Sequence, residues 1–196
     1  MPTTTTTNTT SPSVKLIGVL TIVAGLIMIV AGGFTWGVVT SQLKAEHITV
    51  AAVTEQAPGA LAGKSVADPF TAFAQANAID HHALTASGGR TYAQIGDDST
   101  ALKAKLKADG MSDADIAKDS DVVALATTRT TLMTGSFLRT ALFASVISYG
   151  VAAMAAGLGV LFIAIGFALR TVSTTTVTST PALAAPAANP PVTEKA

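Results

Sequence analysis

The histidines are the residues of this chain best suited to bind a metal ion or to transfer a proton. The sequence contains three of them, His47, His81 and His82, and no cysteine. Adjacent residues of a helix point about 100° apart, so the imidazoles of His81 and His82 do not readily converge on one ion. We interpret this pair as part of a solvated helix surface. If the chain binds a metal ion, the candidate ligands in the sequence are His81, His82 and His47.

The acidic residues between 113 and 121 have part of the pattern of a calcium-binding loop. Such a loop requires glycine at its sixth position and glutamate at its twelfth. Counted from Asp113, these positions hold Lys118 and Ala124, so the pattern fails. No Ser/His/Asp set and no phosphate-binding glycine loop can be singled out either. We therefore expect no catalytic residue, no cofactor-binding residue and no cofactor.

Two long uncharged stretches, residues 16–39 and 140–169, are the main structural signal of the sequence. They hold 24 and 30 residues, whereas about 20 apolar residues cross the hydrocarbon core of a bilayer. The first stretch also exceeds the apolar core of a signal peptide, which is about 7–15 residues long. The sequence thus predicts a mainly α membrane protein with two transmembrane helices, over 14–40 and 140–170.

The composition supports this class and confines the soluble part to the middle of the chain. Only 12% of the 196 residues are charged, against about 25% in ordinary soluble domains. Residues 40–139 hold nine Lys/Arg and eleven Asp/Glu, which is a local net charge of −2. The formal net charge of the whole chain is 0, so nucleic acid is excluded as an expected partner.

The soluble domain, 41–139, is predicted to be small and mostly helical. Asp68 followed by proline is typical of a helix start, and Gly88 is expected to end that helix. After a short bridging piece, Ser99 is expected to cap a second helix that reaches Gly110. No proline follows before the second apolar stretch, so the last helix is expected to continue unbroken into the second span.

The two tails have the composition of disordered segments. Residues 1–13 are rich in threonine, and residues 171–196 are rich in threonine, proline and alanine. Neither tail contains enough apolar surface to offset the conformational entropy lost on folding. We expect both tails to be disordered.

Glycines recur at intervals of seven inside the two apolar stretches. This spacing keeps small residues on one helix face, where two backbones can approach closely. The candidate helix-packing residues are Gly18, Gly25, Gly32, Gly33, Gly37, Gly150, Gly157, Gly159 and Gly166. The partner of these faces is either the other helix of the chain or another protein.

The orientation follows from the number of spans and from the length of the middle domain. Two spans place both termini on one side of the membrane. A loop of 100 residues is long enough to be translocated largely regardless of its charge. We predict a multi-pass plasma-membrane protein with cytoplasmic termini and an extracytoplasmic domain.

Several short strings resemble a family of small actinobacterial two-helix membrane proteins of unassigned function. The strings are Lys15-Leu16-Ile17-Gly18, Gly32-Gly33-Phe34-Thr35-Trp36-Gly37, Gln42-Leu43-Lys44-Ala45-Glu46-His47, Asp68-Pro69-Phe70, Gly88-Gly89-Arg90-Thr91-Tyr92 and Ser136-Phe137-Leu138-Arg139. The resemblance implies two spans that enclose a soluble domain. Its members often carry the label of an aromatic ring-opening dioxygenase, which would imply iron held by two histidines and a carboxylate.

Three functions remain open at this point. The first is a non-enzymatic integral membrane protein that contacts a cell-envelope or membrane complex through its extracytoplasmic domain. Its partners would be the lipid bilayer and other membrane or envelope proteins, or a second copy bound through the Gly/Ala helix faces. The second is a ring-opening, metal-dependent enzyme that uses the three histidines. The third is a lipid or small-ligand receptor, with Phe70, Phe73 and Tyr92 lining its pocket.

Overall fold

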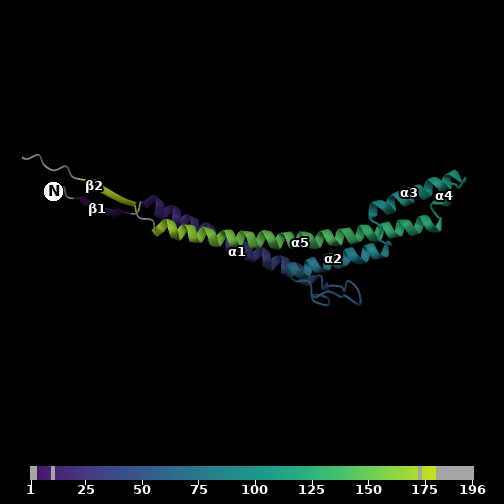
Figure 1. Cartoon of the computed structure of the whole chain (residues 1–196), viewed down its shortest axis with the longest axis horizontal. Coiled ribbons are helices and arrows are strands. Elements are labelled where there is room, and N and C mark those ends of the chain that lie inside the picture. Colours follow the sequence, from purple (N-terminus) through teal and green to yellow (C-terminus); the bar gives the residue numbers. More distant parts are fainter. Residues whose placement is uncertain (1–3, 10–11, 172–173, 180–196) are drawn as a thin grey trace, which may run out of the picture. The chain divides into compact units, whose positions relative to one another are not determined.

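The longest elements are two helices, α1 (Pro12–Ala45) and α5 (Ser120–Thr171). The computed structural model describes residues 4–9, 12–171 and 174–179. The remaining elements are α2 (Pro69–Ala86), α3 (Tyr92–Ala108), α4 (Asp113–Ile116), β1 (Thr4–Thr9) and β2 (Thr174–Ser179). The predicted mainly helical class, with two long apolar helices flanking a small helical region, is confirmed (Figure 1).

Both long helices are long and apolar enough to cross a membrane. Pro12 occupies the first position of α1, where its missing N–H costs no hydrogen bond. No proline occurs within α5, and this helix continues without interruption from the charged part of the chain into the apolar stretch. The last helix of the middle region and the second apolar stretch are therefore one element.

The chain divides into two units, and the first consists of Met1–Leu26 and Val160–Ala196. In this unit β1 and β2 pair antiparallel, with Thr4 opposite Ser179 and Thr9 opposite Thr174. The sequence predicts disorder for the tails 1–13 and 171–196, and β1 and β2 are the parts of them that the structure describes as strands. Residues 1–3, 10–11, 172–173 and 180–196 of the two tails lie outside the described residues.

The second unit is Ile27–Gly159, and α5 is the helix against which its other helices pack. Phe73 of α2 contacts Phe143 of α5, and Tyr92 of α3 lies beneath the guanidinium of Arg129 of α5. As the chain advances from α2 to α3, the contacts on α5 thus move backwards along the sequence. Both helices lie antiparallel to α5, one after the other (Figure 1).

The core of the second unit joins α1, α2 and α5 to the segment between α1 and α2. Its buried residues are Leu43, Val50, Val66, Ala72, Ala76, Leu142 and Tyr149. Two of them, Leu142 and Tyr149, fall within the stretch 140–170 that the sequence predicted as the second span. This part of α5 therefore packs with the end of α1, with α2 and with the segment between them.

Helix α2 begins and ends where the sequence predicted. The Asp68 carboxylate accepts hydrogen bonds from the backbone N–H groups of Phe70 and Thr71, both at 2.9 Å. The Thr71 hydroxyl accepts in turn from the Asp68 N–H at 3.2 Å, which completes a capping box. After the helix, Gly88 and Gly89 have positive φ angles of 68° and 79°, which glycine adopts without steric cost.

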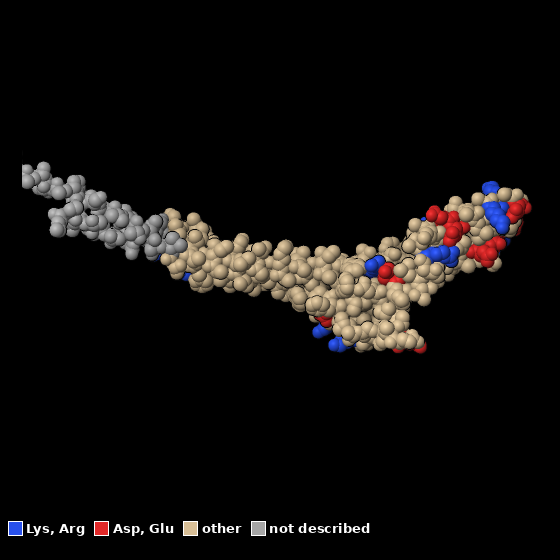
Figure 2. Space-filling view, in the orientation of Figure 1, with Lys and Arg blue, Asp and Glu red and all other residues tan. Residues whose placement is uncertain are grey.

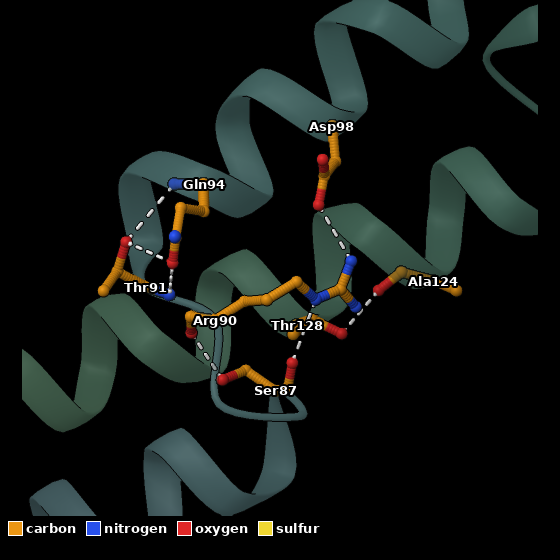
Figure 3. A network of polar contacts seen from close by, with 7 residues as sticks. All are labelled: Ser87, Arg90, Thr91, Gln94, Asp98, Ala124 and Thr128. Atoms are coloured by element: carbon orange, nitrogen blue, oxygen red, sulfur yellow. Dashed lines mark hydrogen bonds and ion pairs between the residues drawn. The ribbon is translucent and has the colours of Figure 1, made fainter.

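The turn into α3 is held by a polar network (Figure 3). The Ser87 hydroxyl donates to the Arg90 carbonyl at 2.5 Å, and the Arg90 guanidinium donates to the Ser87 carbonyl and forms an ion pair with Asp98. Thr91 and Gln94 form a second capping box, so α3 begins at Tyr92. The predicted start at Ser99 was wrong, because the Thr-x-x-Gln pattern at 91–94 already provides a complete cap.

Candidate functional site

An apolar groove lies where α1, α2 and α5 meet in the second unit. Its volume is about 720 Å³, within the size range of small-molecule sites, about 300–1,000 Å³. The end of α1 and the residues after it contribute Val38, Val39, Gln42, Leu43, Glu46 and Ile48. The other walls are Gln75 and Ile79 of α2, and Leu138, Ala141, Leu142, Ala144, Ser145 and Ser148 of α5.

The groove has an apolar end and a polar end, because α1 and α5 run antiparallel along it. Val38 and Ser148 lie at one end, and the Ser148 hydroxyl is occupied by a hydrogen bond to the Ala144 carbonyl at 2.8 Å. Glu46 lies at the other end, directly after Ala45, the last residue of α1, which is about 10 Å from Val38 at 1.5 Å per helical residue. It is the one ionisable residue of the lining.

The amide of Gln75 is fixed in the wall of the groove. Its side-chain oxygen accepts a hydrogen bond from the Ala51 backbone N–H at 2.7 Å. This bond ties α2 to the segment after α1 and orients the Gln75 amide. Over the described residues, the NH₂ group of the same amide has no hydrogen-bond partner, so its two donors can bind an acceptor such as a carbonyl oxygen.

Tyr149 joins three segments directly beside the groove. Its side chain is 1% exposed, and its hydroxyl lies 3.1 Å from the Ala67 carbonyl and 2.8 Å from the Thr40 hydroxyl. Since the carbonyl can only accept, the tyrosine donates to Ala67 and accepts from Thr40. Trp36 packs edge-on against the tyrosine ring, with ring centroids 4.6 Å apart. The end of α1 and the start of α2 are thus both fastened to one residue of α5.

An ion pair between Asp80 and Arg139 connects α2 and α5. The Arg139 guanidinium lies 2.9 Å from the Asp80 carboxylate, and both side chains are 40% exposed. Arg139 also lies over the Phe143 ring at 5.3 Å, and Phe143 contacts Phe73. The Asp80 carboxylate is therefore paired with Arg139 of α5, and not with His81 or His82, which follow it in α2.

The structure does not bring the candidate metal ligands together. The His81 and His82 rings lie edge to face, with centroids 6.1 Å apart, and His47 follows the end of α1. Over the described residues, no three His, Asp or Glu side chains are grouped so that they could hold an ion. Two adjacent imidazoles on a helix surface supply neither the third ligand nor the common direction that a metal site needs.

The predicted glycine positions fall into two groups. In the first unit a Cβ on Gly18 would lie 2.8 Å from the Gly166 carbonyl oxygen, and in the second a Cβ on Gly32 would lie 2.6 Å from the Ala152 carbonyl oxygen. Gly25 and Gly159 are also buried. By contrast, a Cβ on any of the other four would meet no atom within 4 Å: Gly33, Gly37, Gly150 and Gly157.

The three aromatic residues predicted to line a ligand pocket lie apart. Phe70 is exposed, Phe73 packs against Phe143, and Tyr92 packs under Arg129. The groove instead uses aliphatic and small residues. Sequence analysis missed it because side chains such as Ala141 and Ser145 fall in the uncharged stretch and look like part of a membrane span until α2 is placed beside them.

Most charged side chains of the second unit lie at one end of it. Figure 2 shows them over α3, α4 and the first turns of α5, and smaller charged groups lie elsewhere on the unit. One ion pair there joins Lys107 of α3 to Asp113 of α4 at 2.9 Å, and both side chains are largely exposed.

Comparisons with models of protein families, with curated proteins and with solved structures found no match.

Proposed function

We propose that the protein is an integral membrane protein in which α1 and α5 cross the bilayer as an antiparallel helical hairpin. The observation that carries this proposal is the distribution of side-chain size around the two helices. Small residues lie between the helices, where Gly18 faces Gly166 and Gly32 faces Ala152. Large apolar residues point outwards, and Ile27, Val30 and Phe34 are 64%, 70% and 73% exposed.

This distribution is the reverse of what water favours. A helical hairpin in water buries its large apolar side chains, because their burial supplies most of the stability. Lipid tails are as apolar as leucine, so helices in a bilayer associate through close backbone packing at small residues. The buried glycines and the exposed isoleucine, valine and phenylalanine of α1 and α5 therefore support membrane insertion.

The proposed span of α5 begins later than residue 140. Leu142 and Tyr149 are core residues of the second unit, and Tyr149 is hydrogen-bonded to the loop before α2. We place the span at 150–171, which is about 33 Å long at 1.5 Å per residue. Trp36 and Tyr149 then lie at the membrane surface, which is the depth that tryptophan and tyrosine prefer.

Two spans place both ends of the chain on one side and the α2–α4 region on the other. We propose that the ends are cytoplasmic and that the α2–α4 region faces outwards from the plasma membrane. In support of this orientation, only Lys15 is charged among the first 43 residues, so almost no charge precedes the first span. Long loops cross the membrane largely regardless of their charge.

The physiological role that fits this arrangement is non-enzymatic contact with another component of the membrane or cell envelope. The exposed charged side chains of α3 and α4 provide a surface for such a partner, and the exposed Phe70 ring at the start of α2 provides an apolar contact elsewhere. The outward glycines of α1, Gly33 and Gly37, are available to a helix of another chain or of a second copy. Membership of the actinobacterial two-helix family is part of this proposal.

A labelling experiment tests the topology. The chain has no native cysteine, so Ala101→Cys in α3 and Ser13→Cys at the start of α1 give two single, exposed thiols. In intact cells, a membrane-impermeant maleimide should label only the Ala101→Cys variant, and both variants should react after the cells are permeabilised. Labelling of Ser13→Cys alone would show that the orientation is the reverse of the proposed one. Equal labelling of both variants in intact cells would contradict the proposal of two spans.

The enzyme alternative has its own test. Ring opening requires stoichiometric iron held by two histidines and a carboxylate. Elemental analysis of the protein purified in detergent should give the same iron content for the unmodified chain and for His81→Ala. Stoichiometric iron that is lost in His81→Ala would favour the enzyme instead.

A further inference from the structure

We propose that the groove between α1, α2 and α5 binds one acyl chain of a bilayer phospholipid whose headgroup carries a primary ammonium. This inference rests on the proposed membrane insertion. It adds a ligand site that neither the sequence nor the comparisons assign.

The position of the groove favours a lipid over a soluble ligand. Phe34, Val38 and Gln42 follow one another at intervals of four residues, so they lie on one face of α1. Phe34 is exposed on the proposed lipid-facing surface, and Val38 and Gln42 line the groove. The apolar end of the groove is therefore continuous with the surface that faces lipid, and an acyl chain can extend into it from the membrane surface near Trp36 and Tyr149.

The lining favours an acyl chain. Valine, leucine, isoleucine and alanine side chains make up most of the walls, and the Ser145 and Ser148 hydroxyls are bonded to carbonyls of their own helix. A methylene chain needs no hydrogen-bonding partner along this length, and it removes apolar surface from water. The free donors of Gln75 can bind the ester carbonyl that ends such a chain.

The charge at the polar end selects the headgroup. Glu46 is the one ionisable residue of the lining, and over the described residues it forms no ion pair. A primary ammonium attached to the lipid would pair with this carboxylate. A headgroup with a net negative charge and no ammonium would be repelled by it.

Photocrosslinking of the full chain tests the proposal. The protein is reconstituted in vesicles of phosphatidylethanolamine and phosphatidylglycerol, with a trace of either lipid carrying a photoreactive group in one acyl chain. We expect crosslinks concentrated on the groove segments 38–48 and 138–148, with phosphatidylethanolamine preferred about three-fold, as a partly exposed ion pair provides. Glu46→Gln should abolish that preference while the protein remains folded, because Glu46 is exposed.

Two tryptophan variants provide the matched test of the cavity. Ala141→Trp fills the groove, whereas Ile147→Trp places the same ring on the exposed face of α5. Because the indole would occupy the space of the acyl chain, groove crosslinks should fall about ten-fold in Ala141→Trp, which corresponds to about 1.4 kcal/mol, and remain in Ile147→Trp.

The outcomes separate this inference from the proposed function. Crosslinks spread evenly over the outward faces of α1 and α5, unaffected by Ala141→Trp and Glu46→Gln, would overturn the groove as a lipid site and leave the membrane hairpin intact. Protein that does not enter the vesicles at all would overturn both.

Discussion

The backbones of Gly18 and Gly166 are in direct contact. A Cβ built on Gly166 would lie 2.5 Å from the Gly18 carbonyl oxygen, and one built on Gly18 would lie 2.8 Å from the Gly166 carbonyl oxygen. Real Cβ atoms essentially never approach another atom this closely. The antiparallel contact between α1 and α5 in the first unit therefore depends on glycine at both positions.

Two adjacent glycines of α1 should differ in their sensitivity to the same substitution. Gly32→Val places a Cβ 2.6 Å from the Ala152 carbonyl oxygen, whereas a Cβ at Gly33 meets nothing within 4 Å. We expect Gly32→Val to lower the free energy of unfolding by about 1–3 kcal/mol, as overpacking does, and Gly33→Val to change it little. Thermal unfolding of the full chain in mild detergent, followed by circular dichroism, measures both. Equal losses would contradict the observed helix contact.

The two tyrosines of the chain provide a second matched pair. Tyr149→Phe removes the hydroxyl that bonds the Ala67 carbonyl and the Thr40 hydroxyl. Because the carbonyl is left without its donor, we expect a loss of about 1–3 kcal/mol. Tyr92→Phe keeps the ring under Arg129 and should change stability by no more than about 0.5 kcal/mol. The same unfolding assay applies, and a loss for Tyr149→Phe no larger than that for Tyr92→Phe would show that the Tyr149 hydroxyl does not fasten the loop.

The Arg139–Asp80 pair should contribute modestly and depend on salt. Both side chains are 40% exposed, and exposed pairs typically couple by about 0.2–1 kcal/mol. A double-mutant cycle of Arg139→Gln and Asp80→Asn should give a coupling in this range at low salt, decreasing at about 1 M salt because the charges are screened. An absent coupling at low salt would mean that the pair does not join α2 to α5.

The start of α3 distinguishes the structure from the sequence prediction. Thr91 caps the helix, and Ser99 lies within it. We expect Thr91→Ala to lower the free energy of unfolding by about 1 kcal/mol, the usual cost of a lost N-cap, and Ser99→Ala to be neutral or slightly stabilising, since alanine favours helix interiors. If Ser99→Ala were the costlier change, the helix would begin where the sequence analysis placed it.

The elements that the sequence predicted well are those whose signals are local. The uncharged, proline-free stretches predict α1 and α5, and Asp68 with its following proline predicts the start of α2. The start of α3 was also encoded locally, in Thr91 and Gln94, but the weaker cap signal of Ser99 was preferred.

Features that depend on distant residues could not be predicted. Gly32 and Gly33 are adjacent and equally apolar, and only the position of α5 decides which of them must be glycine. Tyr149 lies inside an uncharged stretch, so nothing local distinguishes it from a membrane-spanning residue. Its bond to Ala67, 82 positions away, joins this part of α5 to the segment before α2. The groove likewise exists only when α2 lies beside α1 and α5.

The central claim is that α1 and α5 cross a lipid bilayer with their small residues facing one another. Its most direct test is to wash membranes from cells that express the full chain with alkaline carbonate and then to measure how the chain partitions. We expect the chain to stay in the membrane pellet and to be released only by detergent. Release of the intact chain into the carbonate supernatant would contradict the account.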